Sequence, residues 1–180
     1  RRYGAHGTSH QFVAKKGAEM VGLDLNNSRI ITCHIGNGSS ITAIVNGKSI
    51  DTSMGLTPLE GLVMGTRCGD VDANAVLYMM KKENLTPDQM YDIVNKKSGF
   101  LGVSQKTSDA RELDELANNG DRQAKLVLKM LTFQMIKYIG AYTAEMNGVD
   151  AIFFTGGIGE HNSRLRRRVC ENFTYLGLAF

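Results

Sequence analysis

Hydrophobic and polar positions change their spacing along the chain, and the first third carries the short apolar runs of β-strands. Residues 29–34 and 40–45 are rich in β-branched side chains, and Asn46-Gly47 is a strong two-residue hairpin turn into residues 48–52. Gly36-Asn37-Gly38 supplies a sharp turn between the first two runs. Strands joined in order by such tight turns predict an antiparallel meander.

Farther along, apolar side chains recur at helical spacing. The longest example runs from about Asp121 to Met146, where Val127, Leu131 and Met135 share one helical face. Capping and stop signals place the other helices. The first predicted helix begins at Thr8 or Ser9 and ends near Gly22, and the second begins at Asp70. The third runs from the capping box at 86–89 to Gly99, and the fourth from Ser108 to about Asn118. The long helix runs from Asp121 to Met146, and the last covers residues 164–170.

Two glycine-rich stretches separate these elements. Residues 53–69 show no period, which predicts a long loop, and a loop of that length in a compact domain usually serves a function. Residues 150–155 form a late apolar strand that leads into glycines at 156–159. The order of elements therefore predicts an α/β fold, with an antiparallel β meander followed by helices and a late strand.

Composition narrows the possible functions. The 180 residues suffice for one sizeable domain, and a net charge of +3 is too small to indicate nucleic acid or an anionic membrane as a partner. The three cysteines are scattered, which is typical of reduced thiols in a cytoplasmic protein. Because the sequence opens without Met and stops in apolar residues, we expect a fragment of a larger enzyme.

The first candidate for chemistry is the segment from His34 to Ser40. Two glycines in a tight turn can leave backbone N–H groups free to bind a phosphate, although Gly-Asn-Gly also makes ordinary hairpin turns. Ile41 stands where the third glycine of a dinucleotide fingerprint would fall, and no Gly-Lys-Ser/Thr of a P-loop follows. On its own, the segment slightly favours the ordinary turn.

A second glycine segment, Thr155 to Glu160, lies between a strand and a helix. Glycines there let a phosphate or a flat ring approach the backbone closely, but glycine turns after strands are also common for structural reasons. Together, the two segments indicate a nucleotide held between distant parts of the chain.

Other candidates are weaker when taken alone. His6 and His10 have the spacing of a helical zinc pair, but the glutamate of a metalloprotease is missing, so a structural histidine is favoured. Arg67 lies between glycines on the long loop, where it can either reach a phosphate or remain solvated. Asp109-Ala110-Arg111 is explained by a helix start and a surface arginine. The arginines at 164–168 indicate a solvated helix face.

Five segments in one order and spacing resemble the acetate kinase family of the acetate and sugar kinase, Hsp70 and actin superfamily. The resemblance covers essentially the whole chain, and the segments are far more specific together than singly. The segments are Tyr3–His10, His34–Ser40, Met54–Gly61, Gly65–Asp70 and Gly156–Glu160.

The resemblance implies an actin-like ATPase (ribonuclease H-like) fold and in-line transfer of the ATP γ-phosphoryl group to acetate, giving acetyl phosphate and ADP. It implies that His6 and Arg67 stabilise the transferring group, since such reactions depend mostly on positioning and charge. It also implies that the phosphates of ATP or ADP bind His34, Ile35, Gly36, Asn37 and Gly38. For the nucleoside end, the implied residues are Asp109, Ala110, Arg111, Gly157, Ile158, Gly159, Glu160 and His161.

The same resemblance makes residues 1–180 the C-terminal nucleotide-binding domain, with the N-terminal domain and C-terminal tail outside the chain. The ligands of Mg²⁺ are expected in those missing parts, so no metal ligand is assigned here. A homodimer formed through this half is also implied. Three alternatives stay open: a propionate or butyrate kinase, a non-catalytic nucleotide-binding or dimerising module, and a plain α/β domain with turn glycines if the chain binds no nucleotide.

Overall fold

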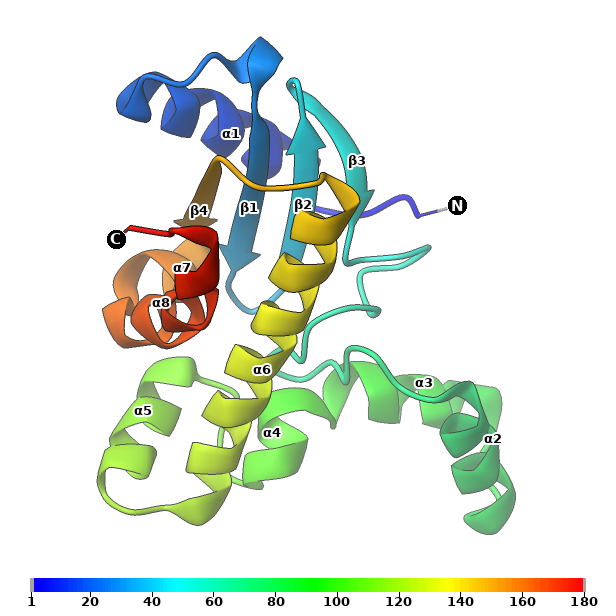
Figure 1. Cartoon of the computed structure of the whole chain (residues 1–180). Helices are drawn as coiled ribbons and strands as arrows, with labels where there is room; N and C mark the ends of the chain where they lie inside the picture. Colours follow the sequence, from blue (N-terminus) through cyan, green and yellow to red (C-terminus); the bar gives the residue numbers. More distant parts are fainter. Residues whose placement is uncertain (1, 180) are drawn as a thin grey trace.

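A mixed sheet with strand order β3-β2-β1-β4 forms one end of the molecule, as the computed structural model shows for residues 2–179 (Figure 1). The described residues hold four strands in this sheet. Their bounds are β1 Arg29–Ile35, β2 Ser39–Val45, β3 Lys48–Thr52 and β4 Ala151–Thr155. The predicted meander of the first three strands is confirmed, and β4 adds to it as a parallel neighbour of β1.

The register of the sheet brings two distant segments together. Ile35 at the end of β1 pairs with Ser39 of β2, so residues 36–38 form the turn between them. His34 pairs in parallel with Thr155, the last residue of β4. Because parallel strands end at the same edge, the turn at 36–38 lies beside the glycines that follow β4.

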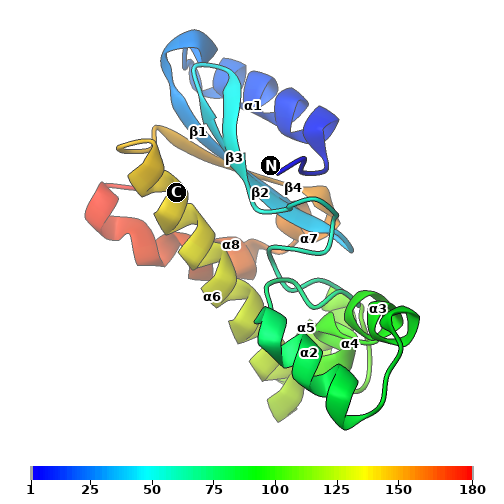
Figure 2. The same cartoon turned by 90° about the vertical axis from the view of Figure 1, so that its right-hand side faces the viewer.

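Helices cover both faces of the sheet and build a lobe below it. Figure 2 shows α1 and α6 on opposite faces, and α1 contacts β1 and β4 while α6 contacts β2. The helices are α1 Gly7–Val21, α2 Ala73–Lys82, α3 Pro87–Lys96, α4 Gly99–Ser104, α5 Ala110–Asn118, α6 Arg122–Glu145, α7 Gly156–His161 and α8 Ser163–Cys170, with short 3-10 turns at Leu25–Asn27 and Glu171–Leu176.

Successive side chains of β1 point to opposite faces of the sheet. Ile31, Cys33 and Ile35 pack toward α6 in the main core. Ile30 packs with helix α1 in a smaller cluster, and period 2 places Thr32 and His34 on that same face. The polar residues of β1 therefore face the start of α1, which carries His6 and His10.

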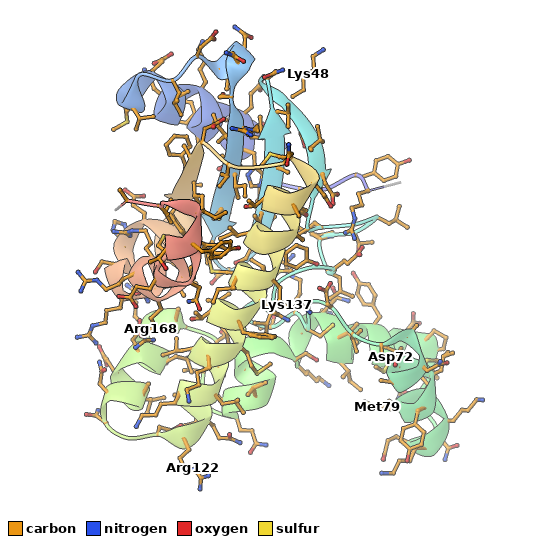
Figure 3. All side chains as sticks on the ribbon, in the orientation of Figure 1. Lys48, Asp72, Met79, Arg122, Lys137 and Arg168 are labelled. Atoms are coloured by element: carbon orange, nitrogen blue, oxygen red, sulfur yellow. The ribbon has the colours of Figure 1, made fainter. Side chains whose placement is uncertain are left out.

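The α2–α3 pair extends away from the sheet. Figure 3 shows Asp72 and Met79 on this projection, well apart from Lys48 at the end of the sheet. Leu77, Tyr78 and Met79 are exposed on α2, which has no buried residue. Among residues 2–179, no helix combines the length and apolarity needed to cross a membrane.

Several helix boundaries differ from the predictions. Helix α1 begins at Gly7 after His6 in a left-handed conformation, without the predicted side-chain cap from Thr8 or Ser9. Asp72, not Asp70, caps α2. Asp70 instead accepts hydrogen bonds from the Gly61 amide and the Tyr138 hydroxyl, which fix the long loop.

Three further boundaries differ from the predictions, two of them at glycines. Gly99 does not stop α3, which ends at Lys96; it begins the short helix α4 with a φ of +63°. Asp109, not Ser108, caps α5. Residues 156–161 are a helix, α7, in place of the expected turn.

Candidate active site

Three histidines form a cluster where the start of α1 meets β1. The rings of His6 and His34 stack with centroids 4.0 Å apart and planes 15° apart. His10 packs edge-on, with its centroid 6.3 Å from that of His6 and 6.4 Å from that of His34. The left-handed backbone at His6 (φ 62°) lets its side chain turn back toward β1 instead of following the helix.

Hydroxyl groups fix the orientation of each ring. Ser40 Oγ hydrogen-bonds His6 Nδ1 at 2.8 Å and His10 Nε2 at 2.7 Å. Thr32 Oγ1 hydrogen-bonds His10 Nδ1 at 2.7 Å, and Ser9 Oγ hydrogen-bonds His34 Nδ1 at 2.8 Å. Both nitrogens of His10 are therefore occupied, which fits the structural histidine favoured by the sequence.

A zinc site is not formed by this cluster. In the part of the chain that the structure describes, no group of three or more His, Cys, Asp or Glu side chains is arranged to hold a metal ion. The neighbours of the histidines are hydroxyl groups and one arginine.

Burial keeps these imidazoles neutral at pH 7. It lowers the pKa of His6 to about 4, with smaller contributions from His34 and Arg67. It also lowers the pKa of His10 to about 4, with contributions from His6 and His34, and lowers the pKa of His34. The cluster therefore presents uncharged nitrogens, and Arg67 brings positive charge beside them.

Arg67 reaches the cluster from the long loop. Its Nη1 donates a hydrogen bond to the carbonyl of Pro58 in the same loop. A methyl group added to Gly38 would lie 2.7 Å from Arg67 Nη2 and 3.4 Å from His6 Nε2. The absence of a side chain at Gly38 thus lets the arginine and the histidine converge beside the turn.

The turn at 36–38 is braced by its own residues. The Gly36 amide donates to the Gly38 carbonyl and to Ser39 Oγ, each at 3.2 Å, and the Ser39 hydroxyl donates to the Gly36 carbonyl at 3.1 Å. Within residues 2–179, the amides of Asn37 and Gly38 make no hydrogen bond. Two adjacent free amides are what a phosphate-binding nest requires.

On the other side of this turn lies a cavity of about 610 Å³. This volume is within the range of small-molecule binding sites. Its walls come from the turn, from α5, and from α7 with the start of α8. The lining residues are Gly36, Asn37, Asp109, Ala110, Arg111, Asp114, Gly157, Ile158, His161, Asn162, Ser163 and Arg164.

Adjacent glycines of α7 have opposite surroundings. Gly156 has a φ of +77°, and a methyl group there would lie 2.6 Å from the Ile35 carbonyl oxygen. Such a group on Gly157 would meet nothing within 4 Å, because this position opens into the cavity. The first glycine therefore holds α7 against β1, and the second keeps the cavity open.

The structure brings together most, but not all, of the residues predicted to bind nucleotide. His34 and Gly38 lie with the histidine cluster. Ile35 is fully buried in the core, and Gly159 is buried against β1. Glu160 is exposed and does not line the cavity.

At the cavity wall, Asp109 has two tasks. Its carboxylate caps α5 by accepting from the Arg111 amide, and it also accepts from the Arg111 guanidinium. These hydrogen bonds lower the pKa of Asp109 to about 2. The carboxylate is thus ionised and holds Arg111 at the cavity mouth, where the guanidinium is largely exposed.

Four lining residues were missed by sequence reasoning. Asn162 Nδ2 donates to Asp114 Oδ2 at 2.6 Å, which ties α8 to α5, and its side-chain oxygen caps α8. Ser163 and Arg164 follow on α8 and line the cavity, and Arg164 is also exposed, as predicted for the solvated face of this helix. Asp114 lies one helical turn after Ala110, so the 3.6-residue period was the signal that could have found it.

A mixed sheet covered by helices on both faces, with a glycine turn and a small-molecule cavity at the ends of its strands, defines an α/β domain with a candidate binding site. A hexokinase of the ROK family from Thermus thermophilus shares the fold, with a TM-score of 0.50 at 15% identity over 91% of this chain and 54% of that one. The chain belongs to the Acetokinase family, whose model matches residues 1–180.

Similar proteins of this family include the acetate kinase of Heliobacterium modesticaldum, which is 57% identical over 99% of this chain and 45% of its own length. The crystal structure of Porphyromonas gingivalis acetate kinase is 49% identical with a TM-score of 0.98, covering 100% of this chain and 45% of that one. A propionate kinase from Francisella tularensis is 43% identical with a TM-score of 0.92, covering 98% and 45%. The chain thus spans less than half the length of these relatives.

Proposed function

We propose that this chain is the nucleotide-binding half of an acetate kinase, which transfers the γ-phosphoryl group of ATP to acetate and, in reverse, makes ATP from acetyl phosphate and ADP. The convergence of His6 and Arg67 beside Gly38, at the end of a cavity, carries this proposal. Membership of the family and an acetate kinase at 57% identity support it.

In the proposed reaction, the chain's residues bind and neutralise charge. The free amides of Asn37 and Gly38 bind phosphate oxygens, and the nucleoside lies in the cavity toward α5 and Gly157. Arg67 and the His6 Nε2–H meet the equatorial oxygens of the transferring group, where charge is spread in the transition state. Positioning of both substrates supplies the rest of the rate.

We also propose that the protein ligands of Mg²⁺ lie outside this chain. The described residues contain no cluster of carboxylates and histidines suited to a metal ion, so ligands outside the chain remain the proposal. When bound, Mg²⁺ would supply further charge neutralisation on the phosphates. A cytoplasmic location and a homodimer are also proposed; the unpaired Cys33, Cys68 and Cys170 support the first, and the exposed apolar residues of α2 support the second.

The carboxylate acceptor has a second candidate. The propionate kinase of known structure matches this chain nearly as well in fold, and no residue here is assigned to the acceptor's alkyl group. A full-length enzyme containing this chain should use acetate with a higher kcat/KM than propionate or butyrate. The opposite ranking would replace acetate kinase with the longer-chain activity.

Calorimetric titration of this chain with Mg-ADP tests the binding site directly. Gly157→Leu should abolish binding without unfolding the protein, because its side chain enters the cavity. Gly140→Leu is the matched control, since Gly140 lies on α6 in open space. Arg67→Ala should still bind ADP, because Arg67 meets the transferring group. Equal ADP affinity in wild type and Gly157→Leu would contradict the proposed site, whereas a folded wild type that binds no ADP would support the interaction-module alternative.

A further inference from the structure

Ser40 Oγ is shared between two imidazoles, although a hydroxyl has only one proton. It lies 2.8 Å from His6 Nδ1 and 2.7 Å from His10 Nε2, and the serine is fully buried. His10 in turn hydrogen-bonds Thr32 through Nδ1. At least one imidazole must therefore donate to Ser40, and the choice of donor determines the tautomers of both rings.

Proton counting leaves one arrangement in which every buried hydroxyl proton has an acceptor. Here Thr32 donates to His10 Nδ1, His10 Nε2–H donates to Ser40, and Ser40 donates to His6 Nδ1. In the reverse direction, His10 Nδ1–H donates to Thr32, whose own proton then has no acceptor. Thr32 is fully buried, and the described residues offer its hydroxyl no other hydrogen bond, so this direction is costly.

A third arrangement has both imidazoles donating to Ser40. The Ser40 proton then lacks an acceptor, again at a buried position. A doubly protonated imidazole is also disfavoured, because burial lowers the pKa of both His6 and His10 to about 4. The first arrangement is thus the stable one at neutral pH.

We propose that Thr32, His10 and Ser40 are positioning residues that hold neutral His6 with its proton on Nε2. Nε2 is the nitrogen near Gly38, on the side that Arg67 also approaches. In this tautomer His6 donates a hydrogen bond to a phosphoryl oxygen; the other tautomer would turn a lone pair toward that anion. The inference rests on the proposed function for its catalytic meaning, but the tautomer is a property of the protein alone.

His34 provides an internal reference for this network of Thr32, His10, Ser40 and His6. Its Nδ1 pairs with Ser9 Oγ, and that hydroxyl has no second imidazole to satisfy. The proton count therefore leaves both tautomers of His34 open. Changes in the network should move the signals of His6 and His10 far more than those of His34.

Long-range ¹H–¹⁵N NMR of this chain, labelled at its four histidines, reads the tautomers at pH 7. In wild type, His6 and His10 should both carry the proton on Nε2. Ser40→Ala should shift His6 toward a mixture of tautomers. Thr32→Val should shift His10 toward a mixture of tautomers. Thr32→Ser should restore the Nε2–H tautomer of His10, because the hydroxyl returns. Thr42→Val is the matched control, since it removes a neighbouring threonine hydrogen bond, to Thr52, outside the network.

Two results would overturn the proposal. One is a wild-type His6 protonated on Nδ1; this needs no variant to fold. The other is a His6 tautomer that does not change in Ser40→Ala.

Kinetics of a full-length enzyme containing this chain separate the inference from the proposed function. Ser40→Ala should lower kcat roughly 10- to 100-fold with KM for ATP nearly unchanged, by analogy with metal-binding histidines that lose the partner that orients them. An unchanged kcat would overturn the positioning role. If wild type makes no acetyl phosphate yet shows the expected His6 tautomer, the proposed function fails and the tautomer assignment stands.

Discussion

The histidine cluster and the cavity lie on either side of the same turn, residues 36–38, but they are built in opposite ways. In the cluster, a buried or partly buried hydroxyl hydrogen-bonds each ring, and Arg67 brings a cation beside the rings. The cavity has exposed walls, such as Arg111 and the open position at Gly157. The proposed phosphoryl end is thus fixed by the protein's own hydrogen bonds, whereas the proposed nucleoside end provides room and few fixed contacts.

The largest effect is expected when the histidine cluster loses the side chain of His6. His6→Ala in a full-length enzyme should lower kcat by roughly 10²- to 10³-fold, because a donor to the transferring group is lost. Affinity for ADP should change little, and steady-state kinetics with calorimetry measures both. A loss of ADP affinity equal to the loss of kcat would show that His6 belongs to nucleotide binding.

The adjacent glycines of α7 give the next largest effect. Gly156→Ala should destabilise the fold by about 2–4 kcal/mol, since it adds left-handed strain and a clash with the backbone of Ile35. Gly157→Ala should change the free energy of unfolding by less than about 0.5 kcal/mol, as for an open surface position. Urea denaturation measures both. Equal losses would mean that α7 is not held against β1.

Acid should loosen the histidine cluster. His10 has a folded pKa of about 4, below its unfolded value, so its contribution to stability is present above about pH 6.5 and is lost as pH falls toward 4. The loss is on the order of 2–3 kcal/mol for this buried ring. Unfolding free energies at pH 7, 6, 5 and 4.5 should fall more steeply for wild type than for His10→Gln. Parallel curves would contradict the assignment.

A smaller effect is expected at the cavity wall. Asp109→Ala should destabilise the protein by about 1 kcal/mol, because α5 loses its N-cap, while Asp109→Asn should retain most of that stability. Thermal unfolding ranks the two variants. If both lose the same stability, the ion pair with Arg111 outweighs the cap, which an exposed pair is not expected to do.

The sequence predicted the structure correctly where residues close together in the chain determine it. Asn46-Gly47 forms the predicted hairpin turn, Thr86 and Gln89 form the predicted capping box, and Asp121 begins the long helix. Gly99 shows the limit of such signals. Its left-handed backbone starts a helix because the backbone of Met64 and Arg67 occupies the space where a side chain would be.

In the candidate site too, some residues could be predicted from the local sequence and others could not. Gly36, Asn37 and Gly157 could be proposed from the sequence, since glycine turns at the ends of predicted strands can be found there. The Asp114–Asn162 hydrogen bond could not, because its partners meet only when α5 and α8 pack together. Ser40 and Thr32 read as ordinary strand residues in the sequence. Their importance depends on which face of the sheet receives His6 and His10.

The parallel pairing of β4 with β1 has a consequence for the order of assembly. The meander and α1 have all their residues within the first third of the chain, so they can form early during synthesis. The last wall of the cavity, residues 157–164, follows β4. Its placement requires β4 to pair with β1, which lies more than a hundred residues earlier in the chain, and such long-range contacts slow folding. Because α1 packs on β4 as well as on β1, the histidine cluster also reaches its final packing only when β4 joins the sheet, and nucleotide binding at the proposed site becomes a marker of that late step.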